Sequence, residues 1–232
     1  MSGPVIFRQF CTPDDEISYL LADPVTRYAA VLDPNLQAER DYLGVIRQLD
    51  LRLIYVIETH VHESHPSAAP VLRAETGVQL ISYRAADLEC VDVRVADDES
   101  IFLGEEVISV METPGHSSCS LSYVWRDCVF TGHTLLAGVT GPCRRADADA
   151  GRLFDSVRQR LFELPDETLV YPGYVTGKGR ISSIGQERAT NTDLQPDTTR
   201  KQFISRKQLE GLHGKSPQEG YTTANRRCEI TD

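Results

Sequence analysis

Three of the six histidines stand in one short stretch, Thr59-His60-Val61-His62-Glu63-Ser64-His65, directly after the apolar run at 51–57. Alternate residues of an extended backbone share a face, so His60 and His62 are expected on one side, with His65 returning from the following turn. Neutral imidazole is the commonest protein ligand for metals, and a cation needs several converging ligands. The spacing therefore indicates a metal site. The alternative, a polar loop with unrelated histidines, would leave clustered imidazoles that are costly to satisfy.

Two more histidines follow turns at the ends of predicted strands. In Thr113-Pro114-Gly115-His116, the Pro and Gly residues force a sharp turn that presents His116. His133 comes after Gly132 and the strand predicted at 128–131. We therefore take His116 and His133 as further candidates for metal ligands. The sixth histidine, His213, lies in a polar segment without a partner motif, and we assign it no role.

Short apolar runs separated by turns predict the strands that position these ligands. An antiparallel opening is expected at 5–7, 17–21 and 28–33, and further strands at 51–57, 78–82, 101–102, 106–110, 121–125, 128–131 and 168–171, with a hairpin turn at 126–127. Apolar spacing predicts helices at 35–48 and 151–161, and a Pro start with a Gly stop predicts one at 66–76. After Gln195 the chain turns polar and basic, which predicts a helix near 201–212 and an irregular tail ending at Cys228.

The composition favours one domain that acts on a small molecule. At 232 residues with 41% hydrophobic content, the chain can bury a full core. Its 24 Lys and Arg against 34 Asp and Glu give a formal charge of −10, which argues against nucleic acid or an anionic membrane as the main partner. Because no apolar run approaches the roughly 20 residues that span a bilayer, and no targeting pattern follows Met1, we expect a cytoplasmic protein.

The cysteines are scattered rather than paired in the sequence. They are Cys11, Cys90, Cys119, Cys128, Cys143 and Cys228. Without any Cys-x-x-Cys pair, neither a zinc knuckle nor a disulfide framework is predicted. We expect most of them to be reduced and several to be buried.

Motifs along the whole chain resemble the metallo-β-lactamase superfamily and, within it, the persulfide dioxygenase family. They are Tyr19-Leu20-Leu21-Ala22-Asp23, Ala30-Val31-Leu32-Asp33-Pro34, Thr59-His60-Val61-His62, Thr113-Pro114-Gly115-His116, Phe130-Thr131-Gly132, Arg145-Ala146-Asp147, Val170-Tyr171-Pro172 and Ala224-Asn225-Arg226-Arg227-Cys228. The resemblance implies an α/β fold, a four-layer αββα sandwich with the metal at one edge. We place the metallo-β-lactamase-like domain at 1–195 and a helical or irregular extension at 196–232, packed on the same domain.

Persulfide dioxygenases use one ferrous ion to convert a low-molecular-weight persulfide, typically glutathione persulfide, and O2 into sulfite and the thiol. The family's two histidine ligands map to His60 and His116, and its aspartate ligand maps to His133, which is a departure from the family. Two other superfamily positions also differ, since Ser64 replaces an aspartate and Tyr174 replaces a histidine. The resemblance therefore implies a mononuclear Fe(II) site of three histidines, with His62, Ser64 and His65 around it to orient the ligands through hydrogen bonds.

The loop at 143–145 and two other positions supply candidates for substrate contacts. Tyr174 is expected to donate a hydrogen bond to bound oxygen or to a substrate sulfur, or else only to fill the volume left by histidine. Arg144 and Arg145 are candidates to grip a substrate carboxylate, with Arg145 favoured, or else form a solvated basic pair. Arg226 is a weaker candidate for substrate binding. Cys143 would act as a sulfur carrier only if the arginines lowered its pKa, and it otherwise packs.

Three functions remain open from the sequence. The first is an iron oxygenase that acts on a persulfide or related thiol. The second is a zinc-dependent hydrolase of a thioester or lactone, similar to glyoxalase II. The third is a catalytically silent relative that binds a thiol or a protein. A hydrolase with two zinc ions needs a bridging carboxylate, and Ser64, His133 and Tyr174 remove the expected ligands, so we rank the oxygenase first. The expected partners are a small-molecule thiol or persulfide and O2, with a homodimer as an option.

Overall fold

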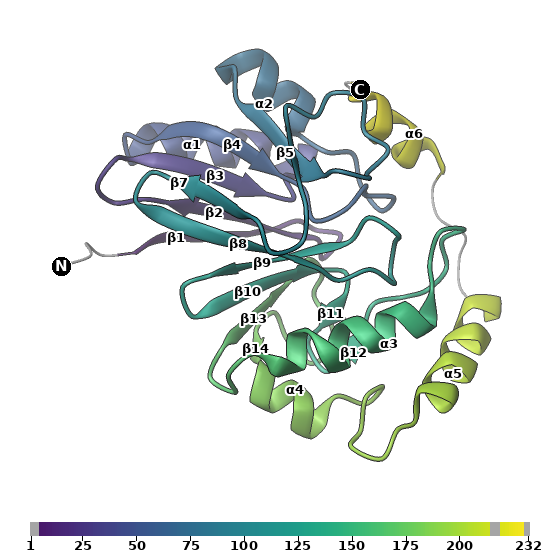
Figure 1. The fold of residues 1–232 in the computed structure, drawn as a ribbon. Helices are drawn as coiled ribbons and strands as arrows, with labels where there is room; N and C mark the ends of the chain where they lie inside the picture. Colours follow the sequence, from purple (N-terminus) through teal and green to yellow (C-terminus); the bar gives the residue numbers. More distant parts are fainter. Residues whose placement is uncertain (1–4, 214–218, 230–232) are drawn as a thin grey trace.

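Two six-stranded sheets pack face to face in the computed structural model, which describes residues 5–213 and 219–229 (Figure 1). In the first sheet the order is β1 (Ile6–Cys11), β2 (Ile17–Ala22), β3 (Tyr28–Leu32), β4 (Arg52–Ile57), β5 (Gln79–Tyr83) and β6 (Val93–Val95). In the second sheet it is β14 (Ser182–Ser183), β13 (Leu169–Pro172), β10 (Cys128–Gly132), β9 (Leu121–Trp125), β8 (Glu106–Glu112) and β7 (Ser100–Leu103). β11 (Leu135–Leu136) and β12 (Val139–Thr140) form a separate two-stranded ribbon.

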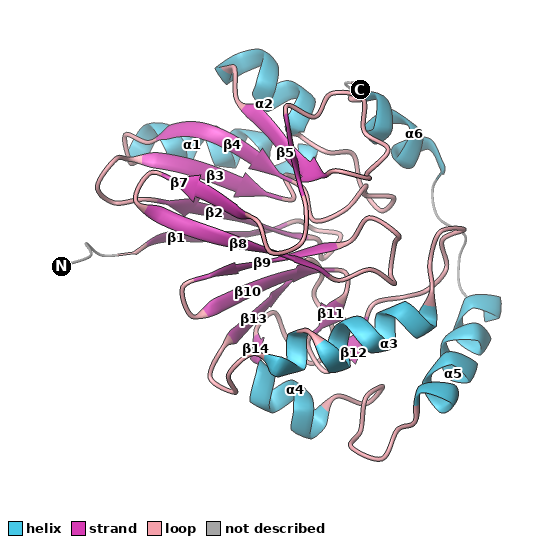
Figure 2. Ribbon diagram, viewed as in Figure 1, coloured by secondary structure: helices cyan, strands magenta, loops and turns pink. Residues whose placement is uncertain are grey.

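Helices cover the outer face of each sheet (Figure 2). The first sheet carries α1 (Glu39–Gln48), preceded by the 3-10 turn η1 (Leu36–Ala38), and α2 (Ala69–Thr76). The second carries α3 (Ala150–Gln159), followed by the 3-10 turn η2 (Leu161–Glu163), together with α4 (Ile184–Thr190) and α5 (Arg200–His213). The last helix, α6 (Glu219–Arg227), lies near α2 and β5 (Figure 1).

Three apolar cores hold the four layers together. The core between the sheets is rich in aromatic rings, including Tyr19, Trp125 and Phe130, which are all buried. The second core joins α1 and α2 to the first sheet, and the third joins α3, α4 and α5 to the second sheet. Apolar burial of this kind contributes about 25 cal/mol for each Å² removed from water. The expected α/β fold, a four-layer αββα sandwich, is therefore confirmed.

The predicted strands and the hairpin at 126–127 are confirmed, with shifts at their ends. Helix α2 begins three residues later than predicted, because the backbone at 66–68 pairs with the segment after β3 instead: Leu36 N donates to Pro66 O and Ala68 N to Pro34 O. Gly77 ends this helix with a left-handed φ of 70°, as expected of a Gly stop. The division of the chain at residue 195 stays a prediction.

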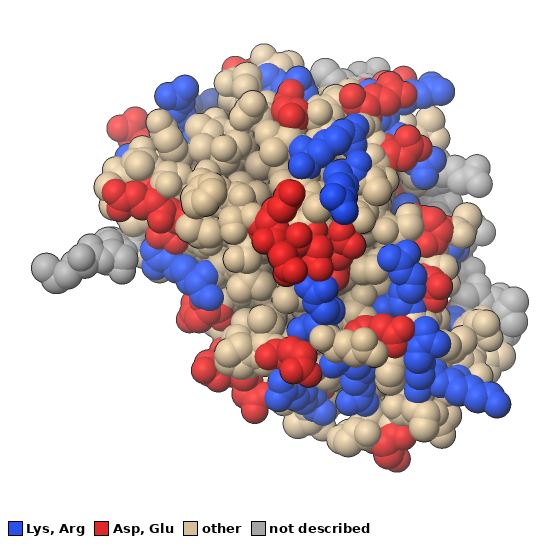
Figure 3. All heavy atoms as spheres, viewed as in Figure 1, with Lys and Arg blue, Asp and Glu red and all other residues tan. Residues whose placement is uncertain are grey.

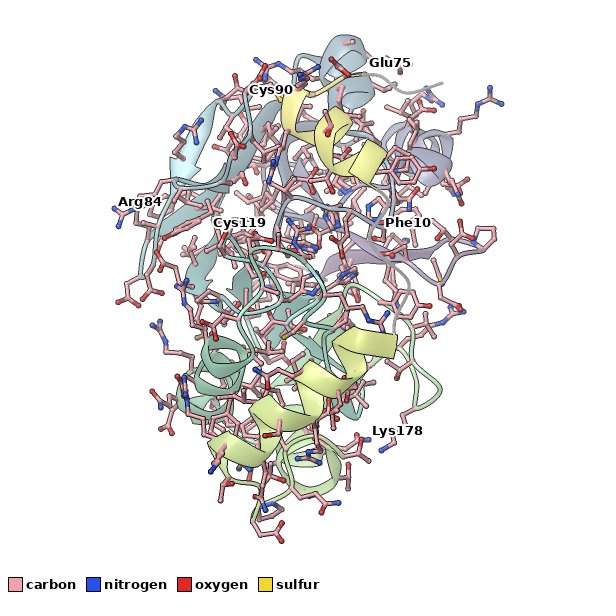
Figure 4. All side chains as sticks on the ribbon, turned by 90° about the vertical axis from the view of Figure 1, so that its right-hand side faces the viewer. Phe10, Glu75, Arg84, Cys90, Cys119 and Lys178 are labelled. Atoms are coloured by element: carbon pink, nitrogen blue, oxygen red, sulfur yellow. A yellow bond between two sulfur atoms is a disulfide. The ribbon has the colours of Figure 1, made fainter. Side chains whose placement is uncertain are left out.

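The irregular tail predicted after α5 is wrong, because residues 219–227 form α6. A disulfide joins Cys228, just after α6, to Cys90 in the loop before β6, and Figure 4 shows Cys90 beside this helix. The expectation of no disulfide therefore needs correction for this pair, which lies 138 residues apart in the sequence. The other four cysteines are free thiols, as expected for most of them.

Removing the disulfide with Cys228→Ser is expected to lower the free energy of unfolding by about 2–5 kcal/mol, because the bond constrains a long loop in the unfolded chain. Denaturant unfolding of the variant and of the oxidised wild type measures this difference. Cys11→Ser, which removes a free thiol, serves as the control and should change stability little. Equal stability of the wild type with and without dithiothreitol would show that the bond contributes nothing.

Surface charge is mixed on the face drawn in Figure 3, where a group of acidic side chains lies between basic ones. Among the described residues, no helix has both the length and the hydrophobicity that crossing a lipid bilayer requires.

Candidate metal centre

The loop after β4 brings His60 to the edge between the two sheets. The carboxylate of Asp33, just after β3, accepts hydrogen bonds from Thr59 N at 2.7 Å and from Thr59 Oγ1 at 2.8 Å. That hydroxyl lies 2.9 Å from His60 Nδ1. The close approach requires glycine at 132, since a Cβ there would lie 2.4 Å from Thr59 Oγ1. His60 is thus held through Nδ1, and its Nε2 is buried without a hydrogen-bond partner.

His116 and His133 are each held through one ring nitrogen as well. His116 Nδ1 donates to the carbonyl of Pro142 at 2.8 Å, which leaves its buried Nε2 without a partner. His133 Nε2 lies 3.2 Å from Oε2 of Glu16, a residue just before β2, so its Nδ1 is the nitrogen left over.

The three imidazoles converge on one point. Ligand atoms of His60, His116 and His133 all lie within 4.8 Å of one another, and all three residues are buried. Burial, reinforced by neighbouring histidines, holds the pKa of His60 and His116 well below the usual value, so both rings are neutral. Buried, neutral nitrogens with unused lone pairs are costly unless a cation binds them. The donor set therefore fits one metal ion.

His62 lies beside this group but belongs to another. Its Nε2 is 3.1 Å from Asp33 Oδ1 and 3.1 Å from Glu58 Oε2. Burial lowers the pKa of His62, but the two carboxylates outweigh burial and raise it well above its usual value. The proton of His62 thus compensates the carboxylate of Asp33, whereas burial raises the pKa of Glu58 above its usual value. The ring of His62 is tilted against that of His60, with the centroids 4.2 Å apart.

The end of α6 secures the same loop. The side-chain amide of Asn225 donates to the carbonyls of His62 and His65, each at 2.9 Å, and its oxygen accepts from Ser67 N at 2.8 Å. Three backbone groups of the histidine loop thus depend on one buried side chain from the far end of the chain. Ser64 and His65 lie next to each other, with Ser64 Oγ 3.2 Å from His65 Nδ1.

A cavity of about 470 Å³ opens over His116 and His133. Its wall also includes Glu16, Ser64, Arg144 and Tyr174. A small molecule in this cavity, whose volume is typical for ligand sites, would therefore contact both histidines.

Residues 13–174 match the family model of the metallo-beta-lactamase superfamily. Mouse "Persulfide dioxygenase ETHE1, mitochondrial" is 30% identical over 237 residues, which cover 98% of this chain and 90% of that protein. The chain belongs to the persulfide dioxygenase family of this superfamily.

Solved structures agree with this assignment. The crystal structure of ETHE1 from Myxococcus xanthus superimposes with a TM-score of 0.92 at 35% identity, covering 97% of this chain and all of that one. A hydroxyacylglutathione hydrolase from Rhodospirillum rubrum is more distant, 29% identical over 72% of this chain and 65% of its own length.

This persulfide dioxygenase relative uses Arg145 differently from the sequence expectation. The side chain is 4% exposed, donates to the carbonyl of Val61 at 2.9 Å and forms ion pairs with Asp147 at 2.9 Å and Glu63 at 3.3 Å. Arg145 therefore holds the histidine loop and has no place on the cavity wall. Its neighbour Arg144 is exposed on that wall.

The other expected substrate contacts also differ. Burial raises the pKa of Cys143 to about 11, more than Lys207 lowers it, so the condition for a sulfur-carrier role is not met and the thiol stays protonated. Arg226 lies on α6, 3.6 Å from Asp87 and away from the residues that line the cavity. Tyr174 does line it, with its ring 6.3 Å from that of His133, and burial raises the pKa of its phenol, which stays a donor.

Sequence reasoning missed the residues that support the ligands. Glu16 directly precedes β2 and Glu58 directly follows β4, and both strands are mostly apolar. An acidic residue in that position is a signal for a buried carboxylate that needs a partner. Asn225 stood within a motif that carried the family resemblance, but only its contacts show what it does.

Proposed function

We propose that this protein is a mononuclear non-haem iron oxygenase that acts on a low-molecular-weight persulfide. The reaction is persulfide plus O2 and water to sulfite and thiol. The observation that carries the proposal is the convergence of three buried imidazoles beside a cavity, two of them with an unpartnered ring nitrogen, in a chain of the persulfide dioxygenase family. His60, His116 and His133 would hold one Fe(II) per chain, and the bound iron would supply open positions where a sulfur anion and O2 meet.

The donor set favours one metal over two. The converging group contains only imidazoles, whereas a two-metal hydrolase needs a carboxylate between its ions. The neighbouring group of Asp33, Glu58 and His62 is already balanced in part by the proton on His62. Substrate hydrolysis at a pair of zinc ions is therefore the weaker alternative.

The cavity wall provides the contacts that a small thiol carrier needs. Arg144 is exposed there and offers a fork of donors to a carboxylate. Tyr174 offers a hydroxyl donor on the same wall. These two residues would orient the carrier so that its terminal sulfur points to the histidines. The homodimer and the cytoplasmic location stay predictions from the sequence.

Metal analysis of protein purified without oxygen, followed by O2 uptake on glutathione persulfide, tests the proposal. We expect about one iron per chain and one sulfite formed per O2 consumed. Glutathione without the extra sulfur is the matched control and should consume no O2. Bound zinc with thioester turnover in the absence of O2 would establish the hydrolase instead, and protein that retains no metal would establish a silent relative.

A further inference from the structure

Glu16 is a buried carboxylate that the backbone fixes between the two sheets. The residue is 5% exposed and directly precedes the fully buried strand β2. It forms a β-bridge with Tyr174, and Ile17 N donates to Gly173 O at 2.8 Å. Because both neighbouring segments are paired, the side chain of Glu16 has little freedom to move away from the metal centre.

The contacts of Glu16 are to histidines. Its Oε2 lies 3.2 Å from His133 Nε2 and 3.4 Å from His65 Nδ1. Among the described residues, no Lys or Arg forms an ion pair with this carboxylate. The same carboxylate oxygen is therefore placed to accept from the ring nitrogens of both histidines.

The three candidate ligands differ in what holds them. A hydroxyl holds His60 and a backbone carbonyl holds His116, so both have neutral partners, whereas His133 alone has a carboxylate. A carboxylate that accepts the proton of one ring nitrogen fixes the tautomer, orients the ring and makes the other nitrogen a stronger ligand. The ring is also tightly packed, since a Cβ at Gly173 would lie 3.0 Å from His133 Cδ2.

We propose that Glu16 is a positioning residue of the metal centre, which holds His133 through Nε2 so that Nδ1 faces the metal and which supplies the negative charge that three neutral imidazoles lack. The inference rests on the metal centre of the proposed function. With a divalent ion and three neutral ligands the centre carries a charge of +2, and Glu16 reduces it to +1, the same as two histidines and one carboxylate give. The negative charge thus lies on a residue that contacts a ligand rather than on a ligand itself, and the metal keeps as many open positions as it has with two histidines and one carboxylate.

Glu16→Gln tests the proposal, because it keeps the shape of the side chain and removes its charge. We expect the affinity for Co(II) and Fe(II), measured anaerobically by chelator competition, to fall about 10–100-fold. Glu210→Gln is the matched control, since Glu210 lines the same cavity but contacts Lys207 rather than a histidine. Its metal affinity should stay within about twofold of the wild type. Equal affinity of Glu16→Gln and wild type, or an equal loss in both variants, would overturn the proposal.

A double-mutant cycle shows whether Glu16 acts through His133. In the His133→Ala background, whose weak residual binding is measured at high Co(II) concentration, Glu16→Gln should lower metal affinity much less than it does in the wild type, because the contact is already gone. Independent, additive losses would mean that Glu16 does not position His133. The reduction potential of the bound iron should rise in Glu16→Gln, since a lost negative charge disfavours Fe(III), and a merely structural residue would not produce this shift.

Chemical rescue provides a second route if Glu16→Gln folds poorly. Glu16→Ala opens space next to the cavity. Added formate should raise the metal affinity of this variant at least about tenfold, whereas chloride should not. No rescue in a variant whose metal-free form unfolds at the wild-type temperature would count against the carboxylate. None of these measurements needs turnover, so they keep their meaning even if persulfide oxidation itself fails.

Discussion

His116→Ala is expected to abolish stoichiometric metal binding. The variant loses one of three converging ligands. The two that remain, His60 and His133, are too few to hold an ion. The affinity should fall by more than the 10–100-fold that is typical for residues outside the ligand set, and O2 uptake on persulfide should fall with it. Metal content after dialysis against a weak chelator measures the first effect, and an oxygen electrode measures the second.

His65→Ala is the control for this prediction. It also removes a buried imidazole of the same site, but its nitrogens lie outside the converging group, so a loss of at most about 100-fold is expected. If His116→Ala kept one metal per chain while His65→Ala lost it, the metal would instead lie on the loop histidines His60, His62 and His65, and the proposed ligand set would be wrong.

Arg145→Ala should lower the free energy of unfolding and leave the affinity for substrate unchanged. Its buried guanidinium pairs with Asp147 and Glu63 and supports the carbonyl of Val61. Truncation leaves these acceptors without their donor, which costs about 3 kcal/mol for a largely buried network. Denaturant unfolding of the metal-free protein should show this loss, and Arg145→Lys should recover only part of it, because Lys cannot reproduce the fork of donors.

Arg144→Ala is expected to have the opposite effect to Arg145→Ala. The side chain is exposed on the cavity wall, so its removal should leave the free energy of unfolding within about 0.5 kcal/mol of the wild type. KM for glutathione persulfide should rise about tenfold to a hundredfold, as expected for a lost charge-assisted contact. A raised KM in a fully stable Arg145→Ala variant, with Arg144→Ala unchanged, would restore the original assignment to Arg145.

Local patterns in the sequence determined most of the sandwich and placed the candidate histidines after strands and turns, whereas the family resemblance selected His60, His116 and His133 among them. His60 follows an apolar strand, His116 follows a Pro-Gly turn and His133 follows the end of a hairpin. Each of these signals is complete within about ten residues, because strand alternation and turn chemistry depend on neighbouring residues. The long strands were predictable for the same reason, whereas β6, β11, β12 and β14, with two or three residues each, are too short to show a period.

Only the tertiary structure decided what surrounds the ligands. Glu16 meets His133 across 117 residues, and Asn225 meets His62 across 163. No local pattern encodes such contacts, because they depend on how the two sheets and α6 pack. The roles of Arg144 and Arg145 could not be predicted from the sequence either, because the residues are adjacent and chemically alike. In an irregular loop, the direction of each side chain depends on which buried acceptors the fold places beside it.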